Sequence, residues 1–445
     1  MNLTHARLVD SFLDSQLRES IYPVLATQNG QPVLTEAVGN LLSEQSGKLT
    51  LQVTGQPEVS SMFRSFFKPT GVVMTQDDHL SIEGSIAGNV SVRARLLNFR
   101  PSIRLKEPQS KLVSELNSIT LSSPAEADQN WIIEGYLTDV PDGIFTTFGA
   151  GETSRLNELE LDLTELTIKL TDFSESRKFV QIRLKDNSCG WNHGLIAGAF
   201  LYTLSTMAGR RIEWRCLSIM NGSQVHSELF IHKSREAEFY KPIDTWKLSK
   251  DSVKEIAEKI FRYYLAHGDC AVGYFLGQCW DFTSFDFPIR QLTLGVAIEG
   301  IASATVNDTE KSGVYYQELK DRLCSFIDEN VIAPLNENET ESESDRLIKV
   351  TVATRLKNVV TGSYELSAQR LIKRAFELVG MTVTKKELDA WSEMRNNHAH
   401  GNVVFKDLTQ ADWDRYLVCV SLLNRLVLGL FGCHEILASV QAAEQ

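Results

Sequence analysis

The sequence predicts an α+β protein of two domains: a β-rich antiparallel amino-terminal domain over residues 1–245 and an all-α helical bundle over residues 246–445. The length of 445 residues fits two or three domains of ordinary size. Segments that alternate apolar with polar residues fill the first part, and segments with helical periodicity fill the second. Nine of the eleven prolines lie at or before Pro242, so we expect the boundary within 241–248.

Composition and charge are those of an ordinary globular protein with an acidic surface. Hydrophobic residues make up 43% and charged residues 23% of the chain, which excludes a disordered or low-complexity protein. The 45 Lys and Arg residues against 57 Asp and Glu residues give a net charge of −12. A nucleic-acid site would therefore be a local basic patch, and binding to an anionic membrane is disfavoured.

The amino-terminal part is predicted to form half-buried antiparallel strands, because its apolar residues recur with a period of two. Two helices are expected within this part, over 4–19 and 195–207. The expected strand-forming segments are 49–53, 80–95, 131–137, 157–170, 179–184, 212–219 and 225–231.

From about Asp251 the apolar residues recur with the period of a helix. Ser252 and Glu255 have the spacing of a capping box, and Pro288 suits the first turn of a helix. Asn336–Asp345 is an acidic run that we expect to form a solvated loop. The expected helices cover 252–267, 288–306, 313–332, 344–360, 363–379, 384–400 and 410–431.

The sequence gives no sign of secretion or membrane insertion, and we expect a cytoplasmic protein. The first ten residues contain no apolar run. The segment 194–209 is too short and polar to span a bilayer, and Asn424 and Arg425 interrupt the more apolar segment 416–433. Seven scattered cysteines form neither a disulfide framework nor a zinc-knuckle pattern, so no metal or cofactor is expected.

One group of residues, at the end of the helix expected over 384–400, suggests a catalytic site. Thr384 and Glu387 form a capping box at its start, and Gly401 suits its end. Arg395 and His400 lie in the last turn and a half, where an Arg can bind phosphate oxygens and a His can transfer a proton. Five residues separate them by about 140° on an ideal helix, so either the helix distorts or a second copy completes the site.

The run Arg395-Asn396-Asn397-His398-Ala399-His400 resembles the Rx4–6H motif of the HEPN superfamily of ribonucleases, in which a polar residue commonly follows the Arg. A β-rich domain ahead of a helical domain resembles, more narrowly, the ApeA-type phage-defence proteins. The resemblance implies a dimeric, metal-independent endoribonuclease that leaves a 2′,3′-cyclic phosphate. Arg395 would hold the phosphate, His400 would act as acid and base, and Asn396 would orient one of them. It also implies abortive infection, in which cutting of host RNA such as tRNA follows a phage-derived trigger.

Other interpretations of these residues stay open. Arg395 and His400 could merely complement the helix dipole, and His398 with His400 could belong to a metal site. Alternatively, His398 is a second polar group near the cleft that the two motifs of a dimer would share. Glu299 would either contact Arg395 or extend into solvent. A basic cluster would either bind an RNA backbone or form a solvated helix face. The cluster consists of Arg370, Lys373, Arg374, Lys385 and Lys386.

Two other functions also stay open. The first is a HEPN-like adaptor that binds RNA or mediates dimerisation without cleaving. The second is a carbohydrate- or protein-binding β-domain whose helices form an oligomerisation unit.

Overall fold

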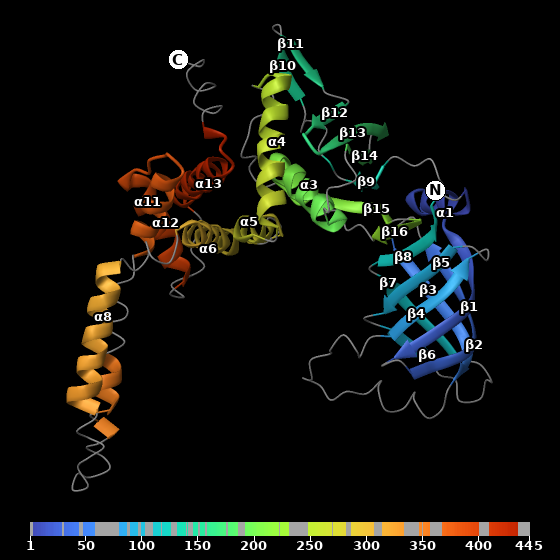
Figure 1. The fold of residues 1–445 in the computed structure, drawn as a ribbon, viewed down its shortest axis with the longest axis horizontal. Helices are drawn as coiled ribbons and strands as arrows, with labels where there is room; N and C mark the ends of the chain where they lie inside the picture. Colours follow the sequence, from blue (N-terminus) through green and yellow to red (C-terminus); the bar gives the residue numbers. More distant parts are fainter. Residues whose placement is uncertain are drawn as a thin grey trace. The chain divides into compact units, whose positions relative to one another are not determined.

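The computed structural model contains an antiparallel sheet in the amino-terminal part and helices in the carboxy-terminal part, which confirms the predicted fold class (Figure 1). The residues that the structure describes are 3–28, 31–43, 48–57, 80–86, 90–96, 99–102, 110–116, 118–125, 131–138, 140, 146–149, 152–155, 158–174, 177–185, 192–221, 223–230, 248–268, 270–281, 286–306, 314–332, 347–348, 350–356, 367–399 and 409–434.

The chain divides into two compact units. The first unit comprises Met1–Glu236 with Ile243–Gly268, and the second comprises Ala237–Pro242 with Asp269–Gln445. The expected boundary within 241–248 falls almost entirely on residues outside the described part of the chain. The helix that follows it packs with the first unit, so the main division of the chain comes after Gly268 rather than at 245.

The first unit is built on one large antiparallel sheet, with three helices among its described residues. The helices are α1 (Leu3–Leu13), α3 (His193–Ala208) and α4 (Lys250–His267). The strands are β1 (Arg18–Gln28), β2 (Gln31–Ser43), β3 (Leu49–Pro57), β4 (Leu80–Ile86), β5 (Val90–Leu96), β6 (Phe99–Ser102), β7 (Ser110–Leu116), β8 (Ser118–Pro124), β9 (Ile133–Thr138), β10 (Thr146–Gly149), β11 (Glu152–Arg155), β12 (Glu158–Asp162), β13 (Leu166–Ser174), β14 (Arg177–Leu184), β15 (Glu213–Asn221) and β16 (Gln224–Phe230).

The strand order of the main sheet is β12-β13-β14-β9-β15-β16-β8-β5-β4-β1-β2-β3-β7-β6, and β10 pairs with β11 separately. Strands β5 and β7 contact each other although four strands separate them in this order, so the sheet curls round on itself here. The curled region encloses a core of alternate strand residues, which is the arrangement that the period-two pattern predicts.

Helix α1 covers one end of the curled region and lies near β8 and β15 (Figure 1). Leu8 and Phe12 contribute fully buried side chains to the core, and the guanidinium of Arg215 lies 4.3 Å from the centre of the Phe12 ring. The helix ends early because Ser15 takes a left-handed conformation with φ of 55°. The expected helix over 4–19 is therefore wrong beyond Leu13, and Glu19 belongs to β1.

A buried polar cluster fixes α1 to the sheet. His5 is fully buried, and its Nδ1 and Nε2 lie 2.7 Å from the hydroxyls of Ser123 on β8 and Ser227 on β16. The Ser227 hydroxyl in turn lies 2.6 Å from that of Ser218 on β15. Burial, the main cause, lowers the pKa of His5 from 6.5 to about 4, so the imidazole is neutral in the folded protein at neutral pH.

Helices α3 and α4 pack against each other beside the strands at the other end of the sheet order. Phe200 of α3 and Ile260 of α4 are fully buried, and Thr206 and Tyr264 are hydrogen-bonded through their hydroxyls at 3.1 Å. Ser249 caps α4 by accepting from the amide of Ser252. The helix thus starts at Lys250, and the expected capping box at Ser252 is wrong by three residues.

The second unit is helical. The elements that the structure describes in it are α5 (Ala271–Asp281), α6 (Phe287–Thr305), α8 (Val314–Ile327), the π-helical segment η4 (Asp328–Ile332), α11 (Ala368–Leu378), α12 (Lys385–Ala399) and α13 (Gln410–Leu430). Residues 350–356 are also helical, and the rest of the expected helix over 344–360 lies largely outside the described residues. The periodicity did not predict α5, because this short helix has few polar residues to mark its outer face.

Helix α6 is the centre of the bundle and contacts α5, α11, α12 and α13. Its apolar residues surround the helix rather than forming one stripe, as burial on several sides requires. Gly300 allows the closest approach, because a Cβ atom there would lie 2.1 Å from the Phe275 ring of α5. None of the helices in the described part of the chain has the length and apolarity that a bilayer span needs.

The buried imidazole of His5 predicts a loss of stability in acid. Its pKa is lower in the folded than in the unfolded chain, so its stabilisation is complete above pH 6.5 and is lost as the pH falls towards 4. Between pH 7.5 and 5.0 the expected loss is about 2 kcal/mol. Urea unfolding of the wild type and of His5→Gln, compared at both pH values, measures it. An equal pH dependence in the two proteins would show that His5 is not buried in the neutral form.

Candidate functional site at the end of helix α12

Helix α12 begins with the capping box that its sequence predicts. The amide and the hydroxyl of Thr384 donate to Oε2 of Glu387 at 2.7 and 2.8 Å, and the amide of Glu387 donates to the Thr384 hydroxyl at 3.3 Å. These bonds satisfy backbone amides that the first turn of a helix leaves without partners. The start of α12, and hence the helical phase of the residues that follow, is therefore fixed locally.

The buried face of α12 packs against α6 at Gly295. Trp391 and Met394 are 3% and 1% exposed, and the indole N–H of Trp391 donates to the Gly295 carbonyl at 3.0 Å. A Cβ atom on Gly295 would lie 3.2 Å from the Cβ of Arg395. Because glycine has no Cβ, the two helices approach closely at the point where Arg395 leaves the backbone.

Arg395 forms an ion pair with Glu299, which lies one turn after Gly295 on α6. Its Nε lies 3.3 Å from Oε2 of Glu299, and both side chains remain about one-third exposed (34% and 31%). Such a pair contributes at most about 1 kcal/mol to stability, so its main effect is to orient the guanidinium. Within the described part of the chain, the two Nη groups of Arg395 have no partner. Of the two alternatives for Glu299, the structure contains the contact with Arg395.

The remaining residues of the motif are described in part. Asn396 is exposed, and its Nδ2 donates to the Ser392 hydroxyl at 3.3 Å. The backbone of His398 lies within α12, which is helical to Ala399, but the side chain of His398 and the whole of His400 lie outside the described residues. Both the acid–base role of His400 and the metal alternative for these two histidines therefore stay predictions.

The start of α13 lies beside the same segments of α6 and α12. Arg415 of α13 contacts Glu393 of α12 at 3.4 Å, and the Gln291 side chain of α6 donates to the Asp412 carbonyl at 3.3 Å. The ring of Trp413, which is 38% exposed, stacks on that of Phe287 at the start of α6 with centres 5.1 Å apart. These contacts join the three helices around the candidate site.

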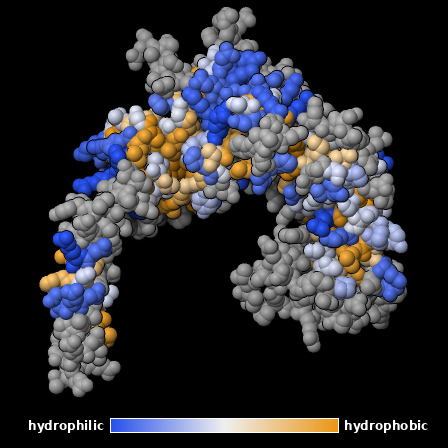
Figure 2. Space-filling model, in the orientation of Figure 1, coloured by the Kyte–Doolittle hydropathy of each residue, from blue (hydrophilic) through white to orange (hydrophobic). Residues whose placement is uncertain are grey.

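The residues of the predicted basic cluster lie on two helices, α11 and α12. On α11, Arg370 and Lys373 are exposed, whereas Arg374 is half-buried and pairs with Glu377 at 3.3 Å. Figure 2 shows hydrophilic and hydrophobic surface side by side over this region of the bundle. Lys385 and Lys386 are exposed at the start of α12, about 15 Å along the helix from Arg395.

Arg425 of α13 has a structural role that the sequence did not indicate. Its guanidinium pairs with Glu387 of the capping box, donates to the Thr382 carbonyl and lies 5.4 Å from the centre of the Phe376 ring of α11. One cation thus joins α11, α12 and α13. Its position in an apolar segment was the available signal, because a charge there needs a specific partner.

Cysteine and metal chemistry have no visible basis in the described residues. They contain no group of three His, Cys, Asp or Glu side chains arranged to hold a metal ion. The six described cysteines form no disulfide, and burial raises the pKa of Cys216, Cys279 and Cys419 to about 12. These three thiols are therefore poor nucleophiles at neutral pH.

The orientation of α12 predicts unequal effects of two substitutions. Met394→Ala removes a buried side chain and should lower the free energy of unfolding by about 2–4 kcal/mol. Asn396→Ala, two residues later on the exposed face, should change it by about 0.5 kcal/mol or less. Urea unfolding of the full chain measures both. Equal losses would contradict the packing of α12 on α6.

Comparison of the chain with models of protein families, with curated proteins and with solved structures finds no match. A function for this site is therefore inferred from its own geometry and chemistry and from the resemblance of its motif.

Proposed function

We propose that the protein is a metal-independent endoribonuclease of the HEPN type, with Arg395, Asn396 and His400 as its active-site residues. The proposal rests on which nitrogen atoms of the Arg395 guanidinium have partners. Its Nε is occupied by Glu299, and its two Nη groups have no partner in the described part of the chain. An Arg guanidinium held in this way presents a planar pair of donors that match two phosphate oxygens.

The proposed reaction is an internal transfer of the phosphate. The 2′-oxygen of the substrate attacks the neighbouring phosphorus, and the bond from phosphorus to the 5′-oxygen breaks. One proton leaves the 2′-hydroxyl and one is supplied to the 5′-oxygen, so the products are a 2′,3′-cyclic phosphate and a 5′-hydroxyl. His400 transfers protons, and Arg395 stabilises the negative charge on the phosphate oxygens in the transition state. No cofactor takes part in these steps.

The proposed active form is a homodimer or a larger homo-oligomer. Helix α12 is continuous to Ala399, so nothing in its described part brings residue 400 round to the side of Arg395. Arg395 is directed to α6, whereas Asn396, which shares a face with residue 400 on a regular helix, is exposed. On a regular helix positions 395 and 400 would point about 140° apart, so we infer that a second copy supplies the missing group.

The proposed biological role is anti-phage defence by abortive infection. In this role the RNA substrate is cellular, a phage-derived component triggers cleavage, and the first unit restrains the second until then. The exposed Arg370 and Lys373 would contact the RNA backbone. This role rests on the resemblance of the motif and of the domain order.

The first test replaces the proposed acid–base residue. His400→Ala should lower RNA cleavage at least about 100-fold, because general acid–base catalysis contributes that much or more. Protection against phage should be lost with it. The matched control is His267→Ala, which removes an exposed histidine from the end of α4, where its Nδ1 lies 2.8 Å from the Tyr263 carbonyl oxygen.

The results of this test distinguish the proposed nuclease from a non-catalytic adaptor and from a metal-dependent enzyme. Cleavage retained by His400→Ala would overturn the assignment of His400. Tight RNA binding by the wild type without cyclic-phosphate products would support the non-catalytic adaptor instead. Cleavage abolished by EDTA would favour a metal site on His398 and His400.

A second test concerns the residue that positions Arg395. Glu299→Gln removes the charge that holds Nε, and we expect kcat to fall about tenfold or more with little change in KM. The free energy of unfolding should change by about 1 kcal/mol or less, because the pair is partly exposed. Glu377→Gln, which breaks the similar Arg374 pair on α11, is the control and should leave kcat unchanged. A normal kcat in Glu299→Gln would exclude the positioning role.

A further inference from the structure

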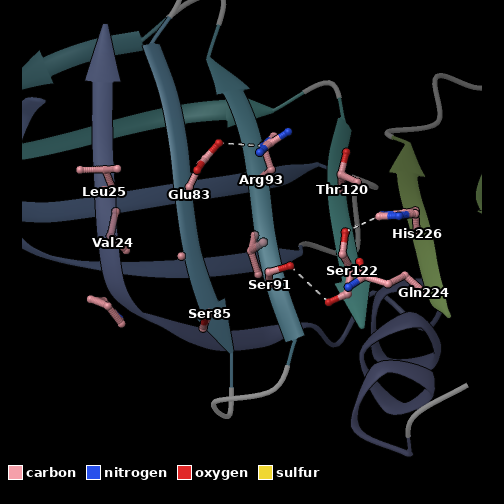
Figure 3. A pocket seen from close by; sticks show the side chains of 13 residues that line it. Val24, Leu25, Glu83, Ser85, Ser91, Arg93, Thr120, Ser122, Gln224 and His226 are labelled. Carbon is pink, nitrogen blue, oxygen red and sulfur yellow. Dashed lines mark hydrogen bonds and ion pairs between the residues drawn. The ribbon is translucent and has the colours of Figure 1, made fainter. Parts of the chain in front are cut away.

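The outer face of the sheet in the first unit carries a pocket of about 710 Å³ that is independent of the motif on α12. This volume is within the range of small-ligand sites. Five neighbouring strands, β1, β4, β5, β8 and β16, supply its walls (Figure 3). The lining residues are Pro23, Val24, Leu25, Glu83, Gly84, Ser85, Ser91, Val92, Arg93, Thr120, Ser122, Gln224 and His226.

The polar side of the pocket is an ordered set of hydrogen-bonding groups. The Ser122 hydroxyl lies 2.8 Å from Nδ1 of His226, and the Ser91 hydroxyl donates to the Ser122 carbonyl at 3.3 Å (Figure 3). Nε of Arg93 lies 2.8 Å from Oε1 of Glu83. Among the described residues, Nε2 of His226 and both Nη groups of Arg93 have no protein partner. These nitrogen atoms are thus available to a ligand.

The opposite wall is apolar and depends on a glycine. Strand β1 has an irregular register between Ile21 and Val24 opposite β2, and it presents Pro23 and the 51%-exposed Leu25 to the pocket. A Cβ atom on Gly84 would lie 2.7 Å from the Pro23 carbonyl oxygen and 2.4 Å from Cγ2 of Ile21. Glycine at this position therefore allows the bulged backbone of β1 to form the wall.

The floor of the pocket, where β8 and β16 carry Ser122 and His226, is rigid because these two strands are also fixed from the core side of the sheet. Ser123 and Ser227 follow Ser122 and His226 directly in the chain, and they bond the buried His5 of α1. The two polar groups of the pocket therefore lie on a strand pair whose spacing is set from within the core. A preorganised set of donors and acceptors loses little freedom when it binds a ligand.

The position and the charge of the pocket restrict its ligand. All five strands are internal in the sheet, so their backbone groups bond neighbouring strands and a peptide cannot bind by adding a strand. The charges of Glu83 and Arg93 cancel, so the pocket lacks the excess positive charge that a nucleic-acid backbone or a polyphosphate requires. A neutral ligand with many hydroxyls and an apolar face fits the polar and apolar groups that line the pocket.

We propose that this pocket binds a short neutral oligosaccharide. Sugar hydroxyls both donate and accept hydrogen bonds, as the side chains of Glu83, Arg93, Gln224 and His226 require. The C–H face of a sugar ring packs against Leu25 and Pro23. The site does not depend on the proposed nuclease activity, and its test uses binding alone.

The test measures binding of neutral trisaccharides to the full chain by isothermal titration calorimetry and ligand-observed NMR. The probes are trimers of glucose, galactose, mannose and N-acetylglucosamine. We expect at least one to bind with a dissociation constant of ~1 mM or below. Arg93→Gln and His226→Leu, which alter exposed or half-exposed side chains, should each weaken binding about tenfold without changing the melting temperature.

Arg183→Ala is the matched control, because Arg183 is an exposed arginine on β14 of the same sheet, outside the pocket. It should leave binding unchanged. Failure of all four trimers to bind at 10 mM (about tenfold above the expected constant) would overturn the proposal. Equal binding by the wild type and both pocket variants would also overturn it, as would displacement of the sugar signal by single-stranded RNA or by an unstructured peptide at this pocket. None of these results would bear on RNA cleavage by the second unit.

Discussion

The close contact between α6 and α12 at Gly295 is the constraint on which the candidate site depends. The missing side chain lets the helices approach until the Trp391 indole reaches the Gly295 carbonyl. Arg395 then leaves α12 beside α6, within reach of Glu299 one turn along. A larger residue at 295 would separate the helices at this point. The ion pair adds little stability, and its importance lies in the direction that it gives to the guanidinium.

In the first unit, helix α1 covers one end of the curled sheet and carries a buried polar residue, His5. His5 is compatible with the core because Ser123 and Ser227 bond its two ring nitrogens, and Ser218 bonds Ser227 in turn. The same strands present Ser122 and His226 on the outer face, so the core and the pocket share one framework. An antiparallel strand permits this arrangement because successive side chains alternate between the two faces.

Local signals predicted the elements well where each signal acts over a few residues. The capping residues Thr384 and Glu387 lie where expected, and Pro288 is in the first turn of α6. Predictions failed where a distant contact decides the outcome. The sequence pattern extends the first helix to Glu19, but residues from Arg18 onward pair with β2. The cap of α4 was also misplaced, for a local reason: the Ser249 hydroxyl accepts from the Ser252 amide, so the helix begins before the predicted capping box.

The sequence by itself determined the α+β class, the change from strands to helices and the candidate motif, because periodicity and capping depend on neighbours in the chain. Only the tertiary structure decided which polar side chains of the protein are in contact. Glu299 and Arg395 are 96 positions apart, and Ser122 and His226 are 104 apart. No local pattern relates such residues, since helix packing brings the first pair together and strand register the second. The structure thus turned one expected contact into an observed one and added a pocket that no motif marked.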